Sequence, residues 1–237
     1  MHIGLIGGIG VAATVVYYQR LTAAVEALGA PLRLTISHGD IQTLIRNNLA
    51  DVRRPQAEIF ARQIDQLRGA GADVAALTSL GAHFCFDELA AIASLPLVSA
   101  LSPLDDAFAA RGIRRVGLLG TRGVMRTRLY GKLTRTAAVA LDEEIDTLGQ
   151  TYQDIAVAGV CTGAQRALLF DAGARMVQGH GADAVVLAGT DLNLAFDGTD
   201  PGYPVIDALD IHVDVLTRLA AGHLALADVA VPAGRPR

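Results

Sequence analysis

The sequence is poor in aromatic rings and in positive charge. It contains no tryptophan, five tyrosines and six phenylalanines among 237 residues, and its formal net charge is −4 at pH 7. So few rings give little surface on which nucleobases stack, and an acidic balance gives no basic surface for a phosphate backbone. Hydrophobic residues still make up 51% of the chain, enough for a substantial buried core. We therefore expect a globular protein that does not bind nucleic acid.

Cysteine and long apolar runs are also scarce. Cys85 and Cys161 are too few for a disulfide framework, and their spacing does not predict a zinc site. No apolar run is long enough to cross a bilayer, and residues 1–10 lack the charged start and the cleavage site of a signal peptide. We expect a cytoplasmic protein with no metal site and no membrane association.

Short apolar runs alternate with longer helical patterns along the chain. Runs bounded by Gly, Pro or Asp predict buried parallel strands at 2–7, 32–37, 74–79, 96–101, 116–121, 182–189 and 203–208. Helical patterns lie at 11–28, 54–70, 83–93, 103–111, 124–137, 163–180 and 207–223. This alternation predicts a doubly wound α/β fold.

The two halves of the chain resemble each other. Residues 4–21 and 117–133 both run from an apolar strand through a glycine-rich turn into a predicted helix that carries a tyrosine, Tyr17 or Tyr130. Residues 71–81 (GADVAALTSLG) likewise match residues 181–191 (GADAVVLAGTD). A pseudo-repeat of this kind predicts two similar lobes built on parallel sheets.

We expect lobe one to comprise residues 1–100 with 208–237, and lobe two residues 101–207, with a cleft between them. Ligands of open α/β sheets bind beyond the carboxyl ends of the strands. We call residues 78–83 the first corner and residues 189–191 the second corner, and expect them on opposite walls of the cleft.

The glycine-rich turn GLIGGIG at residues 4–10 invites comparison with dinucleotide-binding proteins. Its glycines do not fit the Gly-x-Gly-x-x-Gly spacing, and the next predicted strand does not end in a suitably placed acidic residue. Glycines at the start of a helix also let the backbone approach an anion, which the free N–H groups and the helix dipole favour. We therefore expect no nicotinamide cofactor and a carboxylate or phosphate ligand at this turn.

The motifs together resemble the aspartate/glutamate racemase family. The resemblance begins with IGLIGGIGVAATVVYYQRL at residues 3–21 and runs in order over nearly the whole chain. It continues through LPLVSAL, VGLLGTRGVMRTRLY, GADAVVLAGTDL and YPVIDA. The resemblance implies cofactor-independent proton chemistry on an acidic substrate, in a family that also includes hydantoin racemases, arylmalonate decarboxylases and maleate isomerases.

Racemases of this family use two thiols, one from each lobe, because a carbon acid must lose a proton on one face and regain one on the other. Matching the family motif places the first thiol at Ser79, with the following histidine kept as His83, and the second at Gly189. Glycine cannot carry a proton, and a serine hydroxyl needs a base to act. Cys85 and Cys161 lie elsewhere in the sequence and are expected to be bystanders.

The candidate catalytic residues are therefore Ser79, His83 and Asp191. The candidate substrate-binding residues share short polar or minimal side chains, or a guanidinium: Gly8, Thr14, Arg46, Thr78, Thr121, Gly189 and Thr190. Each has a plainer interpretation. Arg46 is equally a surface arginine, His83 orients the first corner as readily as it reacts, and Asp191 is equally a helix cap. Gly189 is expected to widen the wall of the second corner.

These observations leave three functions open. The first is a cofactor-independent enzyme of isomerase, lyase or cyclase type that acts on a small carboxylate or amino-acid-like substrate by proton chemistry on one side only. The second is a catalytically inactive homologue that binds carboxylates. The third is an aspartate or glutamate racemase with substituted acid and base groups. The resemblance also implies a role in amino-acid metabolism and a homodimer.

Overall fold

The computed structural model describes residues 1–234, which form two compact units. Residues Met1–Ala100 and the segment from Asp210 onward form unit 1, and Leu101–Leu209 form unit 2. The chain returns to unit 1 inside helix α10 (Ala208–Ala220), where the sequence analysis expected the boundary at residue 208. No helix in the described part of the chain combines the length and the apolar character that a membrane span requires.

Unit 1 is built on a five-stranded sheet in the order β2-β1-β3-β4-β9. The strands are β1 (His2–Gly7), β2 (Arg33–His38), β3 (Val74–Leu77), β4 (Leu97–Val98) and β9 (Ala230–Val231). The first four run parallel, and β9 pairs antiparallel with β4. Every residue of β1 and β3 is buried, as the continuous apolar runs predicted. The carboxyl ends of β1 and β3 therefore meet at one edge of the sheet.

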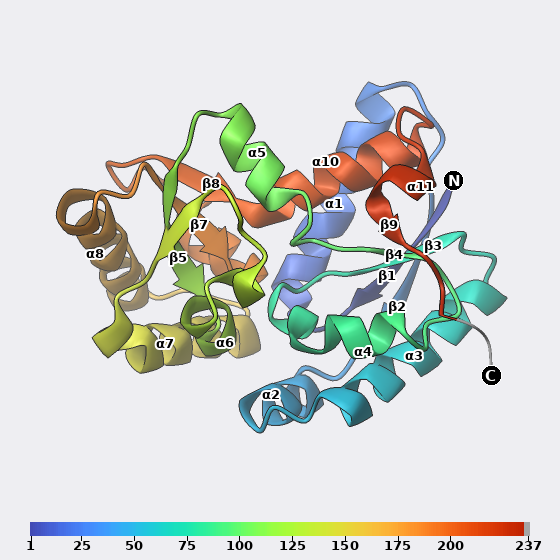
Figure 1. Ribbon diagram of the computed structural model, residues 1–237, viewed down its shortest axis with the longest axis horizontal. Helices are drawn as coiled ribbons and strands as arrows, with labels where there is room; N and C mark the ends of the chain where they lie inside the picture. The colour runs from blue at the N-terminus through green and yellow to red at the C-terminus, as the bar shows by residue number, and fades with distance from the viewer. Residues whose placement is uncertain (235–237) are drawn as a thin grey trace. The chain divides into compact units, whose positions relative to one another are not determined.

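Helices cover both faces of the unit 1 sheet. Helices α1 (Val11–Ala27) and α10 lie on one side, with α3 (Arg53–Gly69) and α4 (Phe86–Ala90) on the other (Figure 1). Helix α1 buries a regular stripe of residues that includes Tyr17, Leu21 and Val25, at the spacing of one helical face. Shorter elements complete the unit: α2 (Ile41–Leu49), η1 (Gly81–Cys85) and α11 (Leu226–Val229).

Unit 2 is built on a four-stranded parallel sheet in the order β6-β5-β7-β8. Its strands are β5 (Arg115–Gly120), β6 (Ala137–Val139), β7 (Ala184–Ala188) and β8 (Val205–Asp207). Its helices are α5 (Leu104–Ala110), α6 (Arg122–Arg126), α7 (Ile145–Ala158), α8 (Gly163–His180) and α9 (Asn193–Phe196), with single turns η2 (Leu129–Gly131), η3 (Asp142–Glu144) and η4 (Thr190–Leu192). Both units thus have the predicted doubly wound α/β architecture on parallel sheets.

The expected helix at 124–137 is wrong. Helix α6 ends at Arg126, and the next residues turn through a left-handed stretch in which Arg128, Leu129, Tyr130 and Gly131 have φ of +52°, +60°, +57° and +67°. The left-handed region is costly for residues with a Cβ and cannot continue a right-handed helix. The chain then enters β6, a three-residue edge strand that the sequence analysis did not predict.

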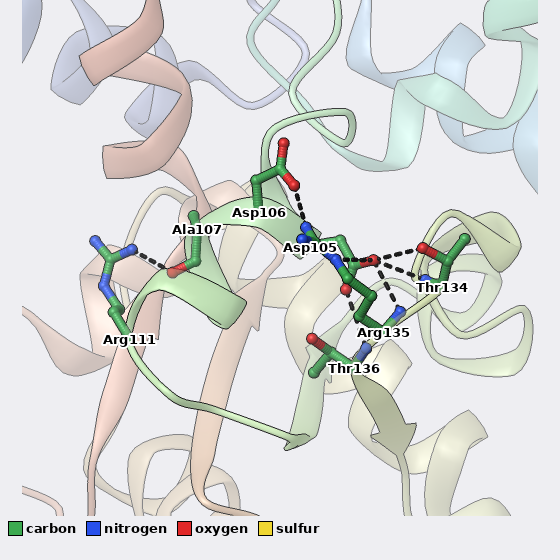
Figure 2. A network of polar contacts seen from close by, with 7 residues as sticks. All are labelled: Asp105, Asp106, Ala107, Arg111, Thr134, Arg135 and Thr136. Carbon is green, nitrogen blue, oxygen red and sulfur yellow. Dashed lines mark hydrogen bonds and ion pairs between the residues drawn. The ribbon is translucent and has the colours of Figure 1, made fainter.

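The carboxylate of Asp105 on α5 fixes the start of β6 (Figure 2). Its Oδ2 accepts hydrogen bonds from the backbone N–H groups of Thr134 and Arg135 at 2.8 and 3.0 Å and from the Thr134 hydroxyl at 2.9 Å. Its Oδ1 accepts the N–H of Thr136 at 3.1 Å. Burial by itself raises the pKa of Asp105, but these donors outweigh it and hold the pKa well below the usual range.

Candidate functional site

The first corner follows β3 and is joined to the end of β1 by two threonines. The Thr78 hydroxyl donates to the Ile6 carbonyl at 3.0 Å and lies 3.2 Å from the Thr14 hydroxyl. Thr14, on the first turn of α1, donates to the Gly10 carbonyl at 2.8 Å and accepts the Gly8 N–H at 2.9 Å. The structure thus brings three of the predicted binding residues, Gly8, Thr14 and Thr78, into one hydrogen-bonded cluster.

The glycine turn before α1 has two specific requirements. Gly8 has φ of +80°, and a Cβ there would lie 2.5 Å from the ring of His38. Glycine is therefore needed both for the backbone conformation and for space. Because the Gly8 N–H already binds Thr14, an anion at this turn would have to compete with the threonine for that donor.

Ser79, which the sequence analysis expects at the position of the first family thiol, has no base at its side chain. The residue is 3% exposed. Within residues 1–234, the structure places no hydrogen-bond partner at its hydroxyl. An unactivated hydroxyl is a weak nucleophile and a weak acid. Ser79 is therefore positioned at the corner but is not activated in this state.

His83 is held by the backbone through both ring nitrogens. Nδ1 lies 2.9 Å from the Ser79 carbonyl, and Nε2 accepts the N–H of Ala100 at 3.1 Å. Because an amide can only donate, Nε2 must be the unprotonated nitrogen, and Nδ1–H donates to Ser79. The ring also stacks on Phe86, with centroids 5.0 Å apart. This geometry favours a positioning role for His83 over proton transfer to a ligand.

Another buried histidine, which the sequence analysis did not single out, lies in unit 1. His212 on α10 is fully buried, and its Nδ1 lies 2.8 Å from the Tyr17 hydroxyl. Burial, together with the nearby His83, lowers the pKa of His212 to about 3, and the backbone of Val98 acts weakly in the opposite direction. A lone histidine in an amphipathic helix gives no local signal of such burial.

Cys85 is part of the core beside the first corner. Its Sγ–H points to the Ala82 carbonyl at 3.5 Å. Burial, helped by the charge of Glu88, raises the pKa of the thiol to about 12. A thiol that stays protonated at neutral pH is a poor nucleophile and a poor base.

Arg46 is exposed near the end of α2 and donates to the Thr43 hydroxyl at 2.8 Å. The contact between α2 and the first corner is made instead by Asn48, whose Nδ2 donates to the Gly81 carbonyl at 3.0 Å. Asn48 was not predicted as a site residue. The adjacent Asn47 bonds Gln56 instead, at 2.8 Å. The sequence alone does not show which of the two asparagines reaches the first corner.

The second corner follows β7 and is fully buried. Thr190 is 1% exposed and Asp191 is 0% exposed. The Tyr152 hydroxyl, from the middle of α7, donates to Asp191 Oδ2 at 3.2 Å. Thr121, at the end of β5, caps helix α6 by accepting the Val124 N–H at 3.2 Å. Asp191 is thus paired with a tyrosine that sequence reasoning missed.

Gly189 does not widen the second corner, contrary to expectation. A Cβ on Gly189 would lie 2.8 Å from both Cδ2 and Cζ of Tyr152 and closer still to Cε2. The tyrosine ring therefore fills the space that a side chain at residue 189 would need. Burial, and next the charge of Asp191, raises the pKa of Tyr152 well above its ordinary value. The phenol stays neutral.

Two further features bear on the site. Across the described residues, no group of three or more His, Cys, Asp or Glu side chains could hold a metal ion. A pocket of about 450 Å³ lies in unit 2, but none of its lining residues belongs to the second corner. They are Arg128, Ala138, Val139, Ala140, Leu141, Asp142, Glu143, Glu144, Arg175 and His180.

Comparison with known proteins places this geometry in a family. The profile of the Asp/Glu/Hydantoin racemase family matches residues 6–216. A Yersinia pestis structure described as a candidate Asp/Glu racemase has a TM-score of 0.77 and 23% identity, over 93% of this chain and 99% of that one. An aspartate racemase homologue from Pyrococcus horikoshii OT3 has a TM-score of 0.73 and 24% identity, over 92% and 98%. The Picrophilus torridus aspartate racemase has a TM-score of 0.72 and 20% identity, over 93% and 94%. The chain belongs to the Asp/Glu/hydantoin racemase family.

Proposed function

We propose that this protein is a cofactor-independent enzyme of isomerase or lyase type that acts on a small carboxylate, with proton transfer on one side of the substrate only. The observation that carries the proposal is the unequal pair of corners. The first corner has a hydroxyl, Ser79, at the position of a family thiol, while the second has Gly189 covered by the ring of Tyr152. Two opposed proton carriers, which racemisation requires, are therefore not available at these two positions.

In this proposal the residues have distinct roles. Ser79 relays a proton between the substrate carbon and a solvent water, and its hydroxyl gives one proton as it takes another. His83 positions Ser79 by donating a hydrogen bond to the Ser79 carbonyl. Gly8, Thr14 and Thr78 bond one another and backbone carbonyls in this state, so a carboxylate bound there has to replace some of these hydrogen bonds. Arg46 and the hydroxyls of Thr121 and Thr190 are the further binding groups of the proposal. Asp191 is the acidic group of the second corner, held by Tyr152. The expectation that both corners act on one ligand stays a prediction, as does the homodimer.

A second candidate function is a carboxylate-binding protein without catalysis. The observation that favours it is the isolation of Ser79: within residues 1–234 its hydroxyl has no hydrogen-bond partner, and the histidine of the same corner, His83, uses both ring nitrogens on the backbone. An aspartate or glutamate racemase with substituted groups is the third candidate, and it needs a second proton carrier that neither corner supplies at the thiol position.

One experiment separates the three functions. The protein is incubated in deuterated water with each enantiomer of aspartate and glutamate and with malonate, and α-proton exchange is followed by NMR. The proposal predicts exchange or turnover of one enantiomer, or decarboxylation, without interconversion of the enantiomers. Full racemisation of either amino acid would overturn the one-sided mechanism. Thermal stabilisation by a carboxylate without exchange would instead support the binding protein.

The role of Ser79 is tested with a matched pair of serine variants. Ser79→Ala should lower the rate by at least about tenfold, as loss of a proton relay does. Ser94→Ala removes a serine hydroxyl of unit 1 that bonds Asp65 outside the first corner, and should leave the rate unchanged. Equal rates in the two variants would remove Ser79 from the mechanism.

A further inference from the structure

Tyr152 reaches the second corner from a distant part of the sequence. It lies in the middle of α7, with 6% of its surface exposed, and α7 packs against β5, α6 and the start of η4. Helix α7 is held close to α6 because Gly149 faces Arg122, where a Cβ would lie 3.1 Å from the Arg122 backbone nitrogen. The ring therefore comes from a helix packed against its neighbours and not from a loop.

The ring and Gly189 exclude any side chain at residue 189. A Cβ at 2.8 Å from two ring carbons is far inside normal contact distance, so either the glycine or the ring must change to admit more atoms. The hydroxyl fixes the ring further, because it donates to the fully buried Asp191 at 3.2 Å. The Thr190 hydroxyl and the Asp191 N–H also point at the phenol oxygen and oppose the rise in its pKa.

We propose that Tyr152 is the specificity-determining residue of the second corner, where its ring takes the volume beside Gly189 and thereby restricts substrates to small carboxylates with no bulky group on that side. This inference rests on the proposed function, because it concerns the same carboxylate ligand. The ring excludes larger substrate groups from the space beside Gly189, and the hydroxyl holds the ring there through its hydrogen bond to Asp191. Removing the ring opens space at the corner, whereas removing the hydroxyl alone keeps the space filled.

The position of the ring is tested first, without any ligand. Gly189→Ala should lower the melting temperature by about 5 °C or more in the natural background, because the added methyl meets the ring. In a Tyr152→Ala background the same change should have little effect or raise the melting temperature, since the cavity accepts the methyl. Equal shifts in the two backgrounds would overturn the proposal.

Ligand size is tested next with succinate and phenylsuccinate, by thermal shift titration of three forms. The natural protein should bind succinate and discriminate against phenylsuccinate. Tyr152→Ala should narrow that discrimination by at least about tenfold, and Tyr152→Phe, which keeps the ring, should retain it. Unchanged discrimination in Tyr152→Ala, or its loss in Tyr152→Phe, would overturn the volume role.

The two tests separate the inference from the function on which it rests. If neither compound stabilises any of the three forms, both the carboxylate ligand and the specificity role are rejected. The melting temperatures of Gly189→Ala in the two backgrounds still show whether the ring lies against residue 189. If succinate binds all forms and phenylsuccinate binds none, carboxylate binding stands and the specificity role fails.

Discussion

The first and second corners share a local plan but are fixed in different ways. Each follows a fully buried parallel strand, β3 or β7, and leads into a 3₁₀ turn, η1 or η4. The first corner is tied to backbone groups of its own unit by His83. The second is tied by a pair of side chains, Tyr152 and Asp191, that come from elements 39 residues apart. Two corners with the same local plan can therefore be held in place by different kinds of contact.

Acid should disturb unit 1 before unit 2, and this is the largest effect expected. His212 has its pKa lowered from 6.5 to about 3, so the unfolded state binds the proton first and the stabilisation present at neutral pH is lost as pH falls below 6.5. The slope for one such group is about 1.4 kcal/mol per pH unit. The Asp105 carboxylate in unit 2, with its pKa lowered from 3.8, keeps its stabilising contribution until the pH falls below that value.

Hydrogen exchange of each unit between pH 7 and 4, corrected for the intrinsic exchange rate, measures this order. His212→Gln should reduce the pH dependence of the stability of unit 1. His223→Gln, which changes an exposed histidine, should leave that dependence unchanged. Earlier loss of protection in unit 2 would contradict the assignment.

Removal of the His83 side chain should lower the free energy of unfolding more than any change at Ser79. His83→Ala deletes two buried hydrogen bonds and the stacking on Phe86, so we expect a loss of about 3 kcal/mol in the free energy of unfolding. His83→Phe keeps a ring and should lose less. Urea unfolding of both variants gives the two values. A loss under about 1 kcal/mol for His83→Ala would show that the contacts of His83 are not needed for stability.

The second corner should respond less strongly to the loss of its hydroxyl. Tyr152→Phe leaves the buried Asp191 without one donor, and the expected cost is about 2 kcal/mol. Tyr203→Phe is the matched control, because the Tyr203 hydroxyl donates to a backbone carbonyl of unit 2, that of Phe170 at 3.1 Å. A smaller loss from Tyr152→Phe than from the control would mean that the pair does not support the corner.

Neither cysteine should take part in proton transfer, and changes to the cysteines should have the smallest effect. Cys85 is buried with its pKa raised to about 12, and Cys161 has its pKa raised by burial. Cys161→Ser should change stability by no more than about 0.5 kcal/mol and leave any proton exchange intact. Cys85 should react with a thiol reagent only after unfolding, and rapid reaction of Cys85 in the native protein would refute its placement in the core.

Much of the fold was predictable because buried parallel strands leave continuous apolar runs in the sequence. The failures have local causes. The Arg128–Gly131 segment looks helical in composition, and only its left-handed backbone ends α6. Strand β6 is three residues long and contains two alanines, so it carries no strand signal. Helix α2 was overlooked although Asp40 caps its first turn, a signal that is visible in the sequence.

The candidate site was likewise predictable only where a local sequence pattern marks the residue. Counting along the family motif proposes Ser79 and Gly189, because each of these residues ends a predicted strand. It could not identify Tyr152, which meets Gly189 from 37 positions earlier along the chain. Nor could it show that both nitrogens of His83 are used. A tertiary contact between residues with no local pattern becomes visible only in three dimensions.

The contact between Tyr152 and Gly189 also has a consequence for the history of the chain. The present position of the ring tolerates only glycine at residue 189, so a larger residue there and this placement of the ring are mutually exclusive. A side chain at residue 189 therefore requires that residue 152 change as well. A new side chain at residue 189 alone meets the ring, whereas removal of the ring first leaves a cavity that the new side chain can fill. The contact thus constrains the order of change: the ring has to change before residue 189 or together with it.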